Sequence, residues 1–142
     1  MNFLLDTNVV SEWTKPRPDS GVVAWLAEVD EDRVFISVIT LAELRYGIER
    51  MPVGAQRNRL DIWVSKQLPA RFEARVLSID AETADTWGRV MARGRTGGRP
   101  VGAMDALIAA TAERRHLTLV TRNVSDFEAL GIRLINPWSK GM

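Results

Sequence analysis

Short apolar runs alternate with amphipathic stretches along this chain of 142 residues. The apolar runs show no regular alternation with polar residues, which is typical of strands that are covered on both faces of a parallel sheet. We predict five such strands, at residues 2–5, 33–37, 75–79, 117–121 and 132–135.

Helical patterns occupy the intervals between these strands. Val22, Leu26 and Val29 share one helix face, since they are spaced as i, i+4 and i+7. The segment Thr40–Leu41–Ala42–Glu43 reads as a capping box, which begins a helix that ends near Arg50. Further helices are expected at residues 55–68, 80–93 and 103–115, with a flexible glycine-rich loop at 94–102.

The alternation of strands and helices predicts an α/β fold with a central, mostly parallel five-stranded sheet flanked by helices. The length suits a single domain over residues 1–142. A hydrophobic fraction of 46% supplies a core, and the chain has no cysteine for disulfide bonds. No apolar run approaches the roughly 20 residues that a membrane span needs, and the N-terminus does not resemble a signal peptide. We therefore expect a cytoplasmic protein without membrane contact.

The charges nearly cancel, at 19 Lys and Arg against 18 Asp and Glu, but the arginines are unevenly placed. One cluster precedes and enters the glycine-rich segment, and a second lies near the end of the 103–115 helix. Local clusters of this kind bind phosphate groups even when the net charge is small, although a solvated helix face is the simpler interpretation for any single arginine. The residues are Arg89, Arg93, Arg95, Arg99, Arg114 and Arg115.

Four acidic residues lie where such a sheet places functional groups. Asp6 ends the first strand, Glu43 lies in the helix after the second, and Asp105 lies near the start of the 103–115 helix. After the fourth strand, either Asp126 or Asn123 supplies the polar group. In α/β sheets, ligands bind at the carboxyl ends of the strands, so these side chains are expected to meet at one edge.

Each of these acids also has a purely structural interpretation. Asp6 is suited to N-capping a following helix, and Glu43 to completing the capping box with Thr40. Asp105 and Asp126 are suited to the first turn of a helix, where the helix dipole favours a negative charge. Together, however, clustered carboxylates repel one another, and a hard divalent cation such as Mg²⁺ or Mn²⁺ relieves that repulsion.

Other reaction chemistries lack their residues in this sequence. There is no cysteine nucleophile, and His116 is the only histidine, best read as a surface cation at a helix end. Neither a GxxxxGK[ST] phosphate loop nor a GxGxxG dinucleotide motif occurs. Metal-assisted hydrolysis is the chemistry that remains.

The motifs that contain these residues resemble those of one known family over nearly the whole chain. Phe3–Leu4–Leu5–Asp6–Thr7–Asn8 is similar to the opening motif of PIN domains, and Ser37–Leu44 with Gly47 is similar to their second motif. Asp105–Ala110 resembles the third motif, and Thr121–Arg122–Asn123 with Asp126–Phe127 the fourth. Among PIN domains the chain most resembles the VapC-like toxins, including the FitB-type members, of type II toxin–antitoxin systems.

This resemblance implies a Mg²⁺-dependent endoribonuclease that is a homodimer and is blocked by a VapB/FitA-like antitoxin, with DNA contacted only through that antitoxin. Asp6, Glu43 and Asp105 correspond to the metal-site acids, and Asp126 is expected as the fourth. Whether one or two metal ions bind stays open. Thr7, Asn8, Thr121 and Asn123 are expected to support the site, and Arg95 and Arg99 to hold the RNA backbone.

Two alternatives from other classes remain. The chain would be a regulatory module if, bound to its antitoxin, it acts mainly in repression of its own promoter with little or no nuclease activity. A phospho-acceptor receiver domain also uses clustered acids on an α/β sheet, but it needs further acids beside Asp6 early in the chain, and these are missing.

Overall fold

The computed structural model describes residues 1–139, in which five strands form one parallel sheet of order β3-β2-β1-β4-β5. This result confirms the α/β fold and the parallel pairing. Each strand is shorter than the sequence predicts, because only the central residues of each apolar run pair with a neighbour. The strands are β1 (Phe3–Leu5), β2 (Val34–Ser37), β3 (Val76–Leu77), β4 (Thr118–Val120) and β5 (Leu134–Ile135).

Helices make every connection between these strands. The longer ones are α2 (Ser20–Glu28), α3 (Val38–Glu49), α4 (Ala55–Ile62), α6 (Ala81–Thr96) and α7 (Ala103–Arg115). The shorter α-helices are α1 (Thr7–Ser11), α5 (Leu68–Phe72) and α8 (Val124–Phe127). Tighter or wider helical turns complete the chain at η1 (Glu12–Thr14), η2 (Glu31–Arg33), η3 (Trp63–Gln67), η4 (Glu73–Arg75) and η5 (Glu128–Leu130).

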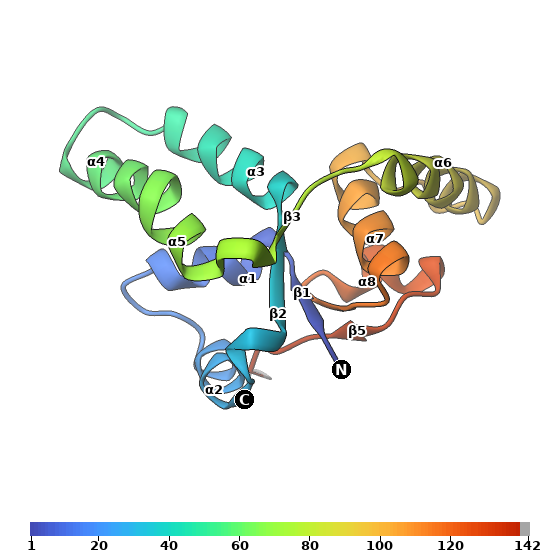
Figure 1. The fold of residues 1–142 in the computed structure, drawn as a ribbon, viewed down its shortest axis with the longest axis horizontal. Helices are drawn as coiled ribbons and strands as arrows, with labels where there is room; N and C mark the ends of the chain where they lie inside the picture. The colour runs from blue at the N-terminus through green and yellow to red at the C-terminus, as the bar shows by residue number, and fades with distance from the viewer. Residues whose placement is uncertain (140–142) are drawn as a thin grey trace.

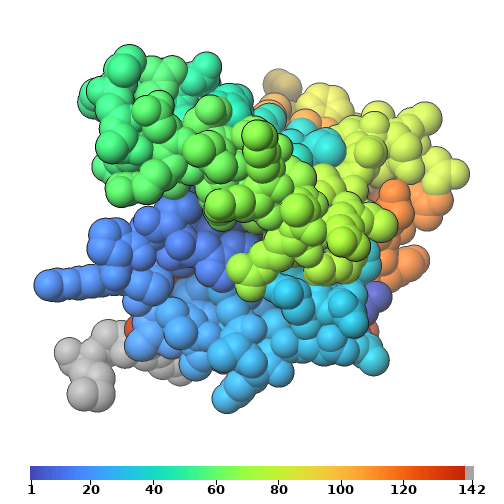
Figure 2. Space-filling model, turned by 60° about the vertical axis from the view of Figure 1, so that its left-hand side comes forward, coloured from blue at the N-terminus to red at the C-terminus, as the bar shows by residue number. Residues whose placement is uncertain are grey.

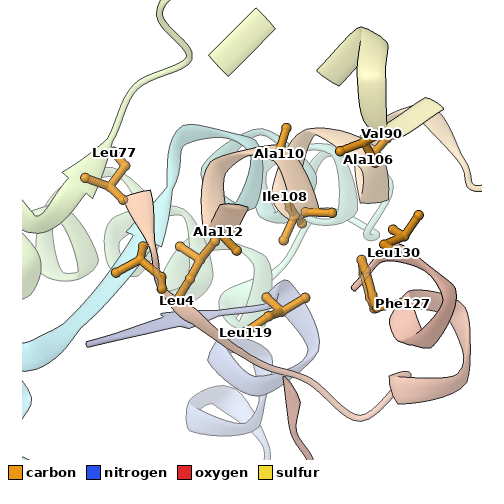
Figure 3. Packing of buried hydrophobic residues seen from close by; sticks show 12 residues of the cluster. Leu4, Leu77, Val90, Ala106, Ile108, Ala110, Ala112, Leu119, Phe127 and Leu130 are labelled. Atoms are coloured by element: carbon orange, nitrogen blue, oxygen red, sulfur yellow. The ribbon is translucent and has the colours of Figure 1, made fainter. Parts of the chain in front are cut away.

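The helices cover both faces of the sheet, as Figure 1 shows with α3 to α5 on one side of the strands and α6 and α7 on the other. Neighbouring strand residues point to opposite faces, so Leu4 and Leu5 belong to two different core clusters. The cluster around Leu4 contains α6, α7 and α8 side chains (Figure 3). The cluster around Leu5 contains side chains of α1, α2 and α5. In Figure 2 the α4–α5 segment, in green, lies above the N-terminal segments, in blue. Both faces are therefore buried, as the unbroken apolar runs predict.

The helix after β2 begins earlier than predicted. Ser37, not Thr40, is its N-cap, and the Ser37 hydroxyl accepts a hydrogen bond from the Ile39 amide at 3.0 Å. Thr40 is buried inside the helix. The predicted capping box of Thr40 and Glu43 is therefore wrong, and both side chains are available for other contacts.

The glycine-rich loop is shorter than predicted, because α6 continues to Thr96 instead of ending near Arg93. Gly94 is buried within α6, and a Cβ there would lie 3.1 Å from the carbonyl oxygen of Arg99. The Arg99 amide in turn donates to the Gly94 carbonyl at 2.9 Å. Gly94 thus lets the chain fold back tightly against the helix, and Gly98, with φ of 73°, makes the turn.

The predicted helix at 55–68 continues to Phe72 and contains a wider turn, η3, at Trp63–Gln67. In this π turn the Leu68 amide bonds to the carbonyl of Trp63, five residues back. Pro69 explains the irregularity, since it has no amide hydrogen and its ring clashes with the carbonyl four residues before it. The helix therefore changes phase next to Trp63.

All five tryptophans are half-buried and pack against the two core clusters. The large apolar side chains with most exposure are others: Met1, Val23, Tyr46, Val53, Ile62 and Met104. Among residues 1–139, no helix is long and apolar enough to cross a membrane.

Candidate active site

The strand order places a crevice between the ends of β1 and β4. The chain moves from β1 to β2 and β3 on one side, and then returns to place β4 on the other side of β1. Such a reversal leaves a gap above the carboxyl ends of the two strands, where α/β proteins bind ligands. Asp6 follows β1 and Thr121 follows β4 at this point. The Thr121 hydroxyl donates to Asp6 Oδ2 at 2.7 Å and joins the two strand ends.

Asp6 is a buried carboxylate, only 5% exposed, with both oxygens engaged. Oδ1 accepts the Thr7 amide at 2.8 Å, so Asp6 does N-cap α1, as its structural interpretation predicts. Oδ2 accepts from Thr121 and, at 3.4 Å, from Asn8 Nδ2. Burial raises the pKa of Asp6, the bonds from Thr121 and Thr7 oppose that rise, and the charge of Asp126 adds to it. Capping and the crevice position therefore coexist in one residue.

Glu43 reaches the same region from α3. Its Oε1 accepts the Thr7 hydroxyl at 2.6 Å, and the Thr7 oxygen also lies 3.0 Å from the Thr40 hydroxyl. A hydroxyl has one proton to donate. Since Thr7 donates its proton to Glu43, Thr40 is the donor in the second bond. This relay fixes the Glu43 carboxylate beside the end of β1.

Asp105 and Asp126 face each other across a cleft of about 380 Å³ between the glycine-rich loop, α7 and α8. The pKa of Asp105 is raised to about 6, mainly by burial and then by the charges of Asp6, Glu43 and Asp126, in that order. Each of these three acids is thus near enough to Asp105 to repel its charge. The structure gathers all four acids predicted from the sequence at one edge of the sheet.

Asn123 lies beside this group but is differently engaged. Its backbone amide donates to the Thr121 hydroxyl at 3.0 Å, while its side chain is exposed and makes no capping bond to α8. The amide of Asp126 bonds to the carbonyl of Asn123 at 3.1 Å, so the two residues share one turn. Asn8 links the strand ends a second time, because its Oδ1 accepts the Arg122 amide at 3.4 Å.

Comparison with known proteins places this geometry in a family. The family described as "PIN domain" matches residues 3–132. The chain belongs to the PIN-domain family. One PIN-domain relative, "VapC ribonuclease Y4jK" of Sinorhizobium fredii, is 41% identical over 96% of this chain and 97% of its own length. "Toxin FitB" of Neisseria gonorrhoeae is 37% identical over 96% of this chain and 98% of its own length.

A solved PIN-domain structure has the same architecture. "Structure of FitAB bound to IR36 DNA fragment" contains a chain that superposes with a TM-score of 0.91 and 34% identity, covering 99% of this chain and 98% of that one. The agreement extends over all five strands and their connecting helices, and it confirms the resemblance inferred from the four motifs.

The donor set of this PIN domain fits a hard divalent cation. Within residues 1–139, no three His, Cys, Asp or Glu side chains converge closely enough to hold a metal ion as they stand. The side chains around the crevice nevertheless offer oxygen donors, four of them carboxylates that repel one another, and Mg²⁺ and Mn²⁺ prefer such ligands. Burial and this repulsion together raise the pKa of Asp105, and a cation would favour its charged form.

The arginines divide into two groups in the PIN domain. Four pair with acids on α6 and α7: Arg89 with Asp85, Arg93 with Glu113, Arg114 with Glu82 and Arg115 with Asp80. Arg99 instead lines the acidic cleft, and its Nη2 donates to the Ser125 carbonyl at 3.0 Å. Arg95 lies beside a neighbouring apolar hollow formed by α6 and the loop. The structure thus separates the two arginines that were expected to act together.

The sequence does not predict that Thr40 donates a hydrogen bond to Thr7 beside Glu43, because its pattern indicates Thr40 as the N-cap of a capping box. The available signal was its place in the apolar face of the helix, three residues before Glu43, where a hydroxyl needs a hydrogen-bond partner.

Proposed function

We propose that this PIN domain is a Mg²⁺-dependent endoribonuclease and the toxin of a type II toxin–antitoxin pair. The observation that supports the proposal best is the gathering of Asp6, Glu43, Asp105 and Asp126 at one edge of the sheet, where burial raises the pKa of Asp105 and the charges of the other three acids add to that rise. Relatives named as a ribonuclease and as a toxin agree with this chemistry.

The four acids would hold the cation, and Asn123 is the alternative to Asp126 in the fourth place. Bound Mg²⁺ supplies positive charge to the scissile phosphate and makes a water molecule more acidic. Thr121 and the Thr7 amide fix the Asp6 carboxylate, and the relay from Thr40 through Thr7 fixes Glu43. These bonds hold the carboxylates in place before substrate binds, which lowers the reorganisation needed in the reaction.

Asp105 serves as a metal-site acid in this scheme. A bound cation would favour the charged form of its half-buried carboxylate and lower its pKa from about 6. Asp105 would then stay charged at neutral pH. Arg99, on the wall of the same cleft, is assigned to bind a phosphate of the RNA backbone without reading sequence, with Arg95 further along the path.

The proposed partner is a VapB/FitA-like antitoxin that covers the acidic crevice and carries the contacts to DNA. The neighbouring FitAB structure, which is bound to a DNA fragment, is consistent with this arrangement. A homodimer is proposed as the assembled toxin. Tyr46, Val53 and Ile62 are exposed apolar side chains on and between α3 and α4, and burying them between two copies would remove apolar surface from water. Sedimentation as a monomer at high micromolar concentration would rule out the homodimer.

The nuclease is tested with purified protein and a labelled RNA. We expect cleavage in Mg²⁺ and none in EDTA. Asp6→Asn should abolish cleavage and leave the circular dichroism spectrum intact, because it removes a charge and keeps the shape. Asp85→Asn is the matched control, since Asp85 is an exposed α6 acid paired with Arg89. Cleavage by the Asp6 variant at the rate of the parent would refute the site, and binding of promoter DNA without any RNA cleavage would favour the regulatory module.

A further inference from the structure

A second hollow adjoins the acidic crevice, and it is formed by different elements. The cleft with Arg99 lies between the glycine-rich loop, α7 and α8, whereas this hollow lies between α1, α3, α4 and η3, on the other side of the sheet (Figure 1). Its volume is about 210 Å³. Its lining includes Thr7, Glu43, Gly47, Ile48, Leu60 and Trp63.

The hollow is continuous with the acidic site through two residues. Thr7 and Glu43 line it, and the hydrogen bond of 2.6 Å between them is the one that fixes the Glu43 carboxylate. Any group in the hollow therefore lies beside the place where the scissile phosphate would be held. A strand of RNA that crosses the crevice from Arg99 would continue toward this hollow.

The lining is mostly apolar, and Ile48, Leu60 and Trp63 contribute to it. This lining suits the flat face of a nucleobase, since aromatic side chains stack on nucleobases whatever their identity. The volume is below the roughly 300–1,000 Å³ of sites for drug-sized ligands, which limits the occupant to about one ring system.

We propose that this hollow binds the nucleobase of a nucleotide next to the cleaved phosphodiester bond, with Trp63 as its stacking surface. The inference rests on the proposed ribonuclease function and adds a positioning site to it. With the base held on one side of the acids and a backbone phosphate held by Arg99 on the other, the scissile phosphate is fixed between them. Positioning at two points restrains the RNA before reaction.

The local backbone of η3 supports this role. The π turn at Trp63–Gln67 changes the helix phase, so that Val64 and Leu68 are buried while Trp63 stays half-exposed at the hollow. Turns of this kind are rare and frequently occur at functional sites. Gly47 on the facing helix leaves the space open, since a Cβ added there meets no atom within 4 Å.

The test measures binding of a short single-stranded RNA oligonucleotide to the protein in EDTA, so that no cleavage occurs. An abasic residue is moved along the oligonucleotide one position at a time. For the parent protein, we expect one position at which base removal weakens binding about 10-fold, as loss of one stacked base predicts. Trp63→Ala should remove that difference, and Trp63→Phe should largely keep it.

Three further variants distinguish an effect on the hollow from a loss of folding. Gly47→Leu fills the space from α3 and should also remove the base dependence, while Gly47→Ala should keep it. Trp25→Ala is the control for loss of a half-buried tryptophan, because Trp25 packs edge-to-face on Phe3 at 5.2 Å, outside the hollow. Trp25→Ala should leave the base dependence unchanged.

The outcomes distinguish this proposal from the proposed function. RNA cleavage without any base-dependent position, or with a dependence that persists in Trp63→Ala and Gly47→Leu, overturns the base site and leaves the nuclease standing. Base-dependent binding that these variants abolish, in a protein that cleaves no RNA, supports the base site and refutes the nuclease. If Gly47→Leu blocks antitoxin binding while its RNA binding equals that of the parent, the hollow is a protein-docking site and the proposal is wrong.

Discussion

Asp105 should destabilise the metal-free protein at neutral pH, and its removal should therefore stabilise it. The pKa of Asp105 rises from the ordinary value of 3.8 to about 6 in the folded chain. Between these two values the folded state binds more protons than the unfolded state, so stability falls as pH rises from about 4 to 6. Above pH 6 the folded protein carries the full destabilisation that the charged Asp105 causes. Asp105→Asn removes the charge and with it this dependence.

The size of the effect follows from the same numbers. A difference of about 2 pKa units corresponds to about 3 kcal/mol at 1.36 kcal/mol per unit. Asp105 is half-buried and lines an open cleft, so solvent screening reduces the effect to about 1–2 kcal/mol. Asp105→Asn also removes a favourable charge from the first turn of α7, which reduces the expected gain in stability by a few tenths of a kcal/mol. The expected gain in Tm is about 3–6 °C for a chain of this size.

The assay is thermal unfolding in EDTA at several pH values from 4 to 8, for the parent and for Asp105→Asn. The variant should be more stable at pH 8, and the difference should vanish near pH 4. Adding Mg²⁺ should stabilise the parent more than the variant, because the cation relieves the repulsion only where the carboxylate is present. A variant that is no more stable than the parent at pH 8, or a difference that is independent of pH, would refute this account of the acidic cluster.

Other predictions concern single contacts around the same crevice. Asp126→Asn should raise the Mg²⁺ concentration for half-maximal cleavage about 10-fold or more, and Asn123→Ala should raise it less, since only the carboxylate brings a charge. The reverse order in a Mg²⁺ titration would assign the fourth ligand to Asn123. Arg99→Ala should reduce the slope of log affinity for RNA against log salt by about one, whereas Arg89→Ala, which loses an exposed ion pair, should not; equal slopes would remove Arg99 from the RNA path. Thr121→Val removes the hydroxyl that lowers the pKa of the buried Asp6 carboxylate at the end of β1, so the acid limb of the pH–rate profile should move to higher pH. An unshifted limb in that profile contradicts the assigned role of this bond.

The sheet and the four acids could be predicted because their signals are local. Each strand lies in a short, mostly apolar run, and Asp6 follows the first of them directly. A parallel sheet then carries the acids to one edge, whatever the details of the helices. The positions of the acids could therefore be predicted from the strand pattern and the sheet topology, without knowledge of any contact.

The contacts within the site depend on side chains that are distant in sequence. The pattern from Thr40 to Glu43 matches a capping box, but Ser37 caps the helix and Thr7, 36 residues before Glu43, binds that carboxylate. Likewise, the glycines after Arg93 predict a loop, yet Gly94 is buried in the helix by the returning chain at Arg99. Local rules find helix formers and breakers, whereas a long-range contact decides which of two allowed roles a residue takes.

The pairing of β1 with β4 determines when catalytic competence arises during synthesis. β1 lies in the middle of the sheet, but its neighbour β4 is separated from it by more than 110 residues, with Phe3 opposite Thr118. A nascent chain that has not yet released Thr118 from the ribosome leaves one edge of β1 unpaired, and Asp6 lacks the hydroxyl of Thr121. The acidic site should therefore be complete only after nearly the whole chain has emerged from the ribosome.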